Sequence, residues 1–123
     1  YGIHALEAIY PIVGPGFKTV RNTGTQERNI IHLTHSREID IIIAVIKDLK
    51  YGGMQIVGSE GYVNVGFKDT FFAFKAQLQA FIDFLRTGRY PFPPEETFEL
   101  IRLVAGAIQS RDHNGLAINL EAK

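Results

Sequence analysis

His4 and Glu7 are the residues whose types and spacing best suit acid–base chemistry. They stand three residues apart in an amphipathic stretch, so on a helix they share a face that is offset from the apolar stripe. A histidine beside a carboxylate can move a proton near neutral pH. From spacing alone, a solvated polar face or a packed histidine at a helix end is the favoured interpretation of the same two residues.

The remaining histidines do not predict a metal site. His32 and His35 are three residues apart on an expected strand, which puts them on opposite faces, so one ion cannot easily bind both. A polar strand edge is the better interpretation of this pair. His113 follows Asp112 in an expected turn, where it fits ordinary turn chemistry.

Two glycine clusters, at residues 14–16 and 58–61, are the candidates for a phosphate loop. Neither continues into the Gly-x-x-Gly or Gly-Lys-Ser/Thr pattern that places a phosphate on a helix N-terminus. Both are interpreted as turns. We therefore expect this chain to bind no NAD or NADP by itself.

The composition is that of an ordinary globular domain. The 123 residues suit one compact domain, and 13 basic residues balance 13 acidic ones without a basic patch, which argues against nucleic-acid partners. The chain has no cysteine, and its longest apolar run, residues 39–46, is far shorter than the ~20 residues of a membrane span. We expect a cytoplasmic protein with no membrane partner, while the presence of a signal peptide in the parent chain stays open.

The elements in their order predict an α+β fold, with a mainly antiparallel sheet and helices packed on one face. Helical periodicity over residues 2–13 ends at Gly14, and Pro11 is expected to kink or loosen that helix. The apolar stripe of the helix at residues 71–85 is expected to cover the sheet, and the phenylalanines between 67 and 84 are interpreted as core. Pro94 is expected to begin the next helix. The expected strands are residues 17–22, 29–35, 38–46, 53–58, 62–67 and 116–120, with a hairpin turn at 59–60.

Apolar residues on both sides of the strand at residues 39–45 predict that one face of the strands from residue 29 to residue 67 is left uncovered by the chain's own helices. We expect that face to bury against another copy of the chain. The first helix also begins without an N-cap residue or an initiator methionine, which predicts that the chain continues a longer one.

Three stretches in the right order resemble the C-terminal domain of the glucose-fructose oxidoreductase/inositol dehydrogenase/rhizopine catabolism (Gfo/Idh/MocA) family. Residues 1–14 are similar to its opening Gly-x-His-x-x-Asp/Glu segment, and residues 56–63 to its Gly-Ser/Thr-x-Gly hairpin. Residues 81–97 are similar to its junction of helix, Gly, Pro and Glu-Thr, and Ser110-Arg111 and Asn114-Gly115 complete the pattern. The similarity spans nearly the whole chain.

The resemblance implies a glyceraldehyde-3-phosphate dehydrogenase-like C-terminal domain that binds substrate and forms oligomers, preceded by a Rossmann domain that binds NAD or NADP. It implies that His4 is catalytic, beside the reacting hydroxyl or carbonyl, and that Tyr1 and Glu7 bind substrate. A lysine from the Rossmann domain, and often an aspartate four residues before the histidine, assist it in the family. Both positions fall outside this chain.

The leading hypothesis is therefore the C-terminal domain of an NAD(P)-dependent oxidoreductase that acts on a sugar, cyclitol or related polyol and is inactive without its other domain. The alternative is a non-catalytic interaction or oligomerisation module that uses the open sheet face. An independent small hydrolase is a weak third hypothesis, because no Ser or Cys lies in a nucleophile context. A Gly-x-Gly-x-x-Gly motif encoded upstream of Tyr1 would separate the first two.

Overall fold

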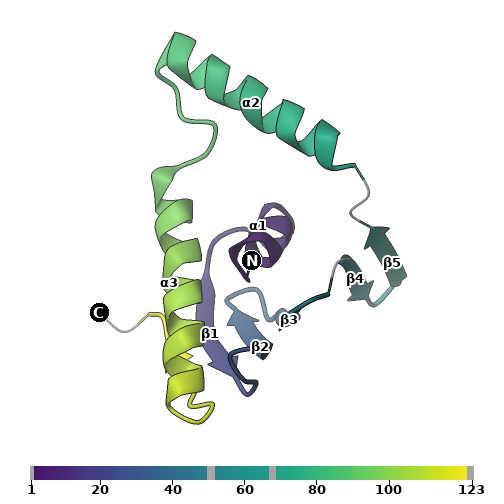
Figure 1. Cartoon of the computed structure of the whole chain (residues 1–123), viewed down its shortest axis with the longest axis vertical. Coiled ribbons are helices and arrows are strands. Elements are labelled where there is room, and N and C mark those ends of the chain that lie inside the picture. The colour runs from purple at the N-terminus through teal and green to yellow at the C-terminus, as the bar shows by residue number, and fades with distance from the viewer. Residues whose placement is uncertain (1, 50–51, 67–68, 122–123) are drawn as a thin grey trace. The chain divides into compact units, whose positions relative to one another are not determined.

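The computed structural model describes residues 2–49, 52–66 and 69–121 of the chain (Figure 1). These residues form two compact units. The sheet unit comprises Tyr1–Lys47 and Pro93–Lys123, and the hairpin unit comprises Asp48–Phe92.

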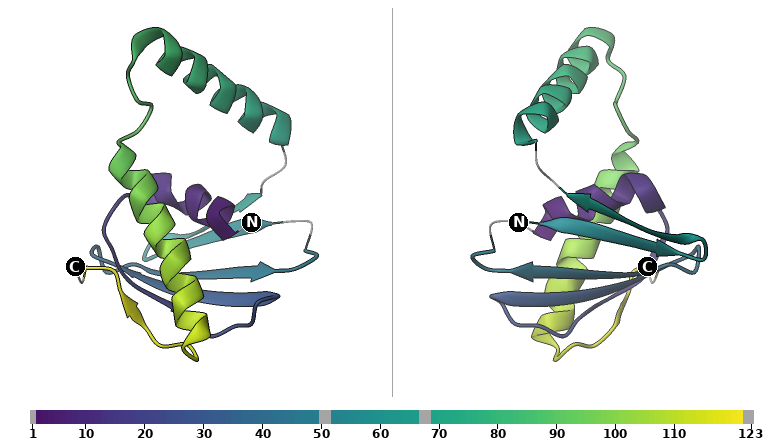
Figure 2. Two further views of the ribbon diagram at one scale, coloured as in Figure 1. Left: turned by 60° about the vertical axis from the view of Figure 1, so that its left-hand side comes forward. Right: turned by 90° about the vertical axis from the view of Figure 1, so that its right-hand side faces the viewer.

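The sheet unit holds a four-stranded antiparallel sheet with the strand order β3-β2-β1-β6. In Figure 2, α1 and α3 lie on the same side of β1, β2 and β3. This arrangement confirms the α+β class with an antiparallel sheet. The elements are α1 (Gly2–Val13), β1 (Phe17–Asn22), β2 (Arg28–His35), β3 (Asp40–Ile46), α3 (Pro94–Asp112) and β6 (Ile118–Asn119).

A glycine ends α1 and a proline begins α3, as the sequence predicts. Gly14 has φ 74° and follows the last residue of α1, and α1 continues through Pro11 to Val13. Pro94 opens α3, with Glu95 and Glu96 in the first turn, where carboxylates favour the positive end of the helix dipole. The last strand is shorter than the expected residues 116–120, because only Ile118 and Asn119 have partners in β1.

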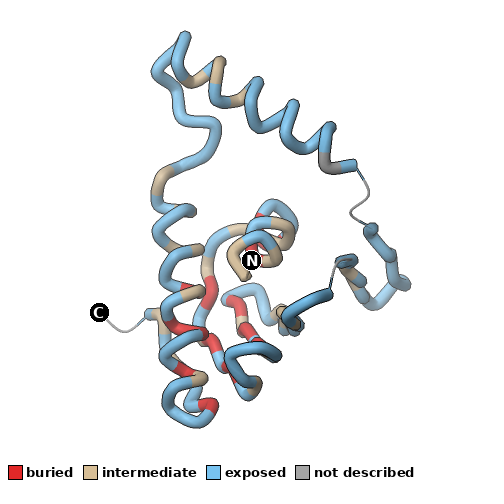
Figure 3. Tube along the Cα trace, viewed as in Figure 1, coloured by how far each residue is buried: buried red, intermediate tan, exposed pale blue. Residues whose placement is uncertain are grey.

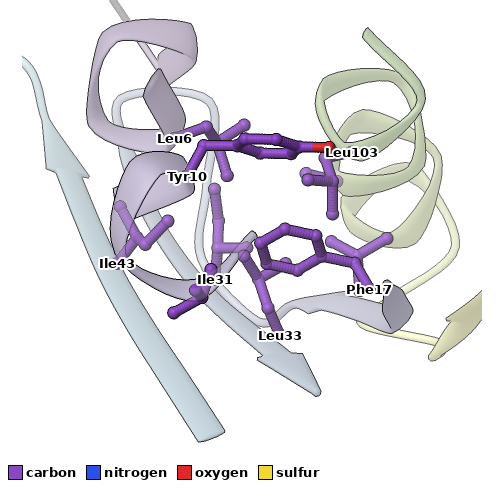
Figure 4. Packing of buried hydrophobic residues seen from close by; sticks show 10 residues of the cluster. Leu6, Tyr10, Phe17, Ile31, Leu33, Ile43 and Leu103 are labelled. Atoms are coloured by element: carbon purple, nitrogen blue, oxygen red, sulfur yellow. The ribbon is translucent and has the colours of Figure 1, made fainter. Parts of the chain in front are cut away.

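The core of the sheet unit lies between the sheet and its two helices (Figures 3 and 4). Val20, Leu33 and Leu103 are fully buried, one from β1, one from β2 and one from α3. The other buried side chains come from alternate positions of the strands and from the inner faces of the helices. They are Leu6, Tyr10, Val13, Phe17, Ile31, Ile43 and Ala107.

The opposite face of β2 and β3 is exposed. Ile30 and Ile42 point away from the buried set, and Ile42 keeps 76% of its surface in solvent. This agrees with the expectation of an uncovered face for these two strands. The face is mixed rather than fully apolar, since His32 and Asp40 lie among its exposed residues.

Gly106 is the point of closest approach between α3 and β1. A Cβ atom at this position would lie 2.6 Å from Cγ1 of the buried Val20 and 3.4 Å from Cδ2 of Leu120.

Overpacking costs roughly 1–3 kcal/mol of folding free energy, whereas replacing a glycine in a helix by alanine stabilises the helix by roughly 1 kcal/mol. Gly106→Ala is therefore expected to lower the free energy of unfolding by about 1 kcal/mol, as measured by urea denaturation. Ala105→Ser, on the exposed side of the same turn, is the control, and a Gly106→Ala variant as stable as the parent would contradict the close packing.

The hairpin unit consists of β4 (Gly53–Gly58), β5 (Gly61–Gly66) and α2 (Thr70–Thr87). Gly58 pairs with Gly61, so Ser59 and Glu60 form the two-residue turn that the sequence predicts. Asp69 caps α2 by accepting a hydrogen bond from the backbone N–H of Phe72 at 2.8 Å, and Gly88 ends the helix with φ 67°.

Within the hairpin unit, β4 and β5 do not bury the apolar stripe of α2, and the four-stranded sheet that this stripe is expected to cover belongs to the other unit. The side chains of this stripe are each more than half exposed except Ile82, which is partly exposed, and none of the described residues of β4, β5 or α2 is buried (Figure 3). A two-stranded hairpin is too small to bury a helix of 18 residues. The stripe consists of Phe71, Phe74, Leu78, Phe81, Ile82 and Leu85.

Candidate active site

His4 and Glu7 lie on the first two turns of α1 and form a pair. His4 Nδ1 is 2.9 Å from Glu7 Oε2, and the two side chains are 72% and 51% exposed. Their side of the helix is offset from the core face of Leu6, Tyr10 and Val13, as the spacing predicts. The structure therefore brings together two of the three predicted site residues, and the third, Tyr1, lies outside the described residues.

A carboxylate held against Nδ1 gives the imidazole the features of an acid–base catalyst. It fixes the tautomer with the proton on Nδ1 and stabilises the imidazolium that forms when the ring accepts a second proton. The pair is at the surface, where a small substrate can reach it. Among residues 2–49, 52–66 and 69–121, no group of three or more His, Asp or Glu side chains is arranged to hold a metal ion.

His32 and His35 lie on opposite faces of β2, as predicted, but not at a sheet edge. β2 lies between β1 and β3, so the interpretation of a polar strand edge is wrong. His32 is on the exposed face, with Nε2 2.7 Å from Asp40 Oδ1, whereas His35 is 3% exposed. The three-residue spacing places the two histidines on opposite faces of β2 but does not tell which of these faces is buried.

His35 has a structural role inside the sheet unit. Its Nδ1 accepts a hydrogen bond from the backbone N–H of Arg37 at 3.1 Å, which leaves Nε2–H to donate to the carbonyl of Pro15 at 3.0 Å. Its ring also meets Phe17 edge-on, with 5.1 Å between ring centroids. His113 agrees with its predicted turn role, since its Nδ1 lies 2.8 Å from the carbonyl oxygen of Gln109 at the end of α3.

Glu99 is the polar residue that sequence reasoning missed. Its Oε1 accepts hydrogen bonds from the backbone N–H groups of Gly16 and Phe17, both at 2.9 Å, and its Oε2 accepts one from the hydroxyl of Tyr10 at 2.5 Å. In Figure 4 the Tyr10 hydroxyl points toward α3, the helix that carries Glu99. The partners are more than 80 residues away along the chain, so no local motif could have indicated them.

A cavity of about 290 Å³ lies beside this contact. It mixes apolar and acidic side chains, and His4 and Glu7 do not line it. The lining residues are Tyr10, Pro15, Phe17, Pro93, Glu95, Glu96, Glu99, Arg102 and Leu120.

Burial raises the pKa of the Tyr10 hydroxyl, and the hydrogen bond to Glu99 and the charges of Glu99 and Glu96 raise it further. The folded chain therefore keeps this proton above pH 10, roughly where an unfolded tyrosine loses it. The stabilising contribution is complete below about pH 10 and is lost as the pH rises toward the raised pKa.

Wild type is accordingly expected to lose free energy of unfolding more steeply above about pH 10 than Tyr10→Phe. The difference in slope is at most about 1.4 kcal/mol per pH unit, the value for one proton. Urea denaturation at a series of pH values measures it. Parallel curves for the two proteins would show that Tyr10 is not the group responsible.

The described elements do not include a Rossmann unit. Every strand pair among them is antiparallel, whereas the Rossmann unit joins parallel strands through a helix. Among the described residues, no helix has both the length and the apolar character that crossing a membrane requires.

Comparisons of the chain with protein families, with curated proteins and with solved structures found no match.

Proposed function

We propose that this chain is the substrate-binding domain of an NAD(P)-dependent oxidoreductase that acts on a sugar, cyclitol or related polyol. The observation that carries the proposal is the His4–Glu7 pair at the exposed start of α1. The motifs of the Gfo/Idh/MocA resemblance occur in order around this pair, and the α+β sheet unit is compatible with the C-terminal domain of that family.

In this proposal the chain supplies proton transfer and substrate binding. His4 accepts the proton from a substrate hydroxyl during oxidation and returns it during reduction, while Glu7 holds the imidazole and stabilises its charged form. Glu7 and Tyr1 are assigned to contacts with the other hydroxyl groups of the substrate. An exposed pair on a helix can meet a polyol without rearrangement of the core.

No redox step is assigned to the residues of this chain. The proposal places the dinucleotide on a Rossmann domain that precedes this domain in the same polypeptide. It also includes a homo-oligomer formed through the open face of β2 and β3.

The test is the formation of NADH or NADPH by the complete gene product in the presence of a panel of sugars and cyclitols. Turnover with at least one polyol is expected, and the chain of residues 1–123 alone is expected to show none. Absence of turnover across the panel, in a protein that binds neither dinucleotide by calorimetry, would refute the proposal.

A non-catalytic oligomerisation module is the second candidate, and the exposed apolar surface favours it. Ile30 and Ile42 are exposed on the sheet, and the stripe of α2 is exposed as well. Burial of apolar surface is favourable by roughly 25 cal/mol for each Å² removed from water, so these exposed side chains favour an interface.

Ile42→Glu tests the interface that both candidates use, because it places a charge on the open sheet face and leaves His4 and Glu7 unchanged, and turnover then separates the two candidates. If the face joins two copies, light scattering should show a dimer for the parent chain and a monomer for the variant. Ala44→Gly, on the same face of β3, is the control. A module without catalysis predicts this change of state together with an absence of turnover in every form of the protein.

A further inference from the structure

The turn between α1 and β1 is held from two sides. Its carbonyl groups face the end of β2 and the turn that follows, and its N–H groups face α3. Each contact joins segments that are far apart in the sequence. The angle at which α1 packs on the sheet therefore depends on polar side chains that belong to other elements.

The carbonyl side is satisfied by His35, Ser36 and Arg37. His35 Nε2 lies 3.0 Å from the carbonyl oxygen of Pro15 and 3.3 Å from that of Gly14, and Arg37 Nη1 donates to the carbonyl of Val13 at 3.2 Å. The backbone N–H of Ser36 donates to the carbonyl of Gly16 at 2.9 Å. These bonds hold the turn against the sheet.

The N–H side is satisfied by Glu99 alone among the described side chains. One carboxylate oxygen accepts both backbone N–H groups, and the other accepts the Tyr10 hydroxyl from α1 itself. Hydrogen bonds to a charged acceptor are stronger and more directional than neutral ones. Glu99 therefore connects α3, the helix α1 and the first residues of β1 through one side chain.

The geometry points to Glu99 as a positioning residue that fixes the angle of α1 against the sheet. In this way Glu99 sets where His4 and Glu7 lie. The inference rests on the function proposed above for His4. Three buried side chains, Leu6, Tyr10 and Val13, hold α1 by apolar contact. Such contact is non-directional, so it keeps the helix on the sheet unit without fixing its angle. A catalytic group displaced by about 1 Å loses on the order of a hundredfold in rate, so the angle matters for turnover.

Hydrogen exchange on the chain of residues 1–123 tests the structural part. In Glu99→Ala, the amides of α1 and of Gly16 and Phe17 should exchange about tenfold faster or more, while those of β2 and β3 keep their protection. Glu99→Gln should restore most of the protection, because its amide oxygen can accept from the two N–H groups. Glu95→Ala, in the same helix and exposed, is the control and should change nothing in α1.

Two results would overturn this part. One is unchanged exchange in α1 of Glu99→Ala. The other is an equal loss of protection in α1, β2 and β3, which would make Glu99 a general stability residue. If Glu99→Ala fails to fold, Tyr10→Phe removes one of the three bonds and decides the question, with faster exchange in α1 expected and unchanged exchange contradicting the inference.

Turnover of the complete gene product tests the functional part. Glu99→Ala should lower kcat about tenfold or more with little change in KM, and Glu99→Gln should recover most of it. In a double variant with His4→Ala, the loss of Glu99 should cost no further turnover, because a residue that acts only through His4 has nothing left to position. Additive losses would overturn the positioning role. Full turnover in His4→Ala would instead refute the proposed function, and the exchange result would still decide whether Glu99 fixes α1.

Discussion

Replacing His4 by alanine is expected to lower turnover of the complete gene product by roughly a hundredfold or more, the usual scale for the loss of a positioned acid or base. Its melting temperature should change little, because His4 is 72% exposed and contributes nothing to the core of the sheet unit. Steady-state kinetics beside thermal melts of the same preparations measure both quantities.

Glu7→Gln is the matched variant for this prediction. It keeps an oxygen that can accept from His4 Nδ1–H but removes the charge that stabilises the imidazolium, so its loss of turnover should be smaller than that of His4→Ala. An unstable His4→Ala protein that keeps its activity per folded molecule would leave His4 as a structural residue and would refute the site.

Leu103→Ala is expected to lower the free energy of unfolding by about 2–5 kcal/mol, the largest effect on stability among these predictions. Leu103 is completely buried, and in Figure 4 it lies in the core with side chains from α1 and the sheet. Its truncation removes apolar burial and leaves a cavity that a helix packed on a sheet cannot easily close.

Ile101→Ala is the control for that experiment, because Ile101 lies two residues away in α3 and is about half exposed. Its cost should be well below that of Leu103→Ala. Urea denaturation gives both values. Equal losses at the two positions would contradict the assignment of the inner face of α3.

Local sequence signals predicted most of the elements, because their causes are local. Gly14 and Gly88 stop helices through positive φ angles, Pro94 begins one, and the Gly58–Gly61 segment makes a two-residue hairpin turn. The spacing of His4 and Glu7 likewise indicated a shared helix face, and the structure places them in contact.

Features that depend on distant residues were not predictable in the same way. The contacts of Glu99 and the burial of His35 arise when segments separated by about 20 to more than 80 residues come together. The surface that covers α2 was not predictable for a related reason. The apolar stripe indicates that the helix should be covered, but periodicity does not tell which surface covers it.

The catalytic claim is tested most directly by chemical rescue of His4→Ala with imidazole. The position is exposed, so a free imidazole from solution can reach the place of the missing ring and move the same proton. Turnover of the complete gene product with its polyol substrate is measured against imidazole concentration, with Leu49→Ala, an exposed substitution in the hairpin unit, as the control. We predict that turnover of His4→Ala rises with imidazole and that the control does not respond; a folded His4→Ala protein whose low turnover is unchanged by imidazole would contradict the assignment of proton transfer to His4.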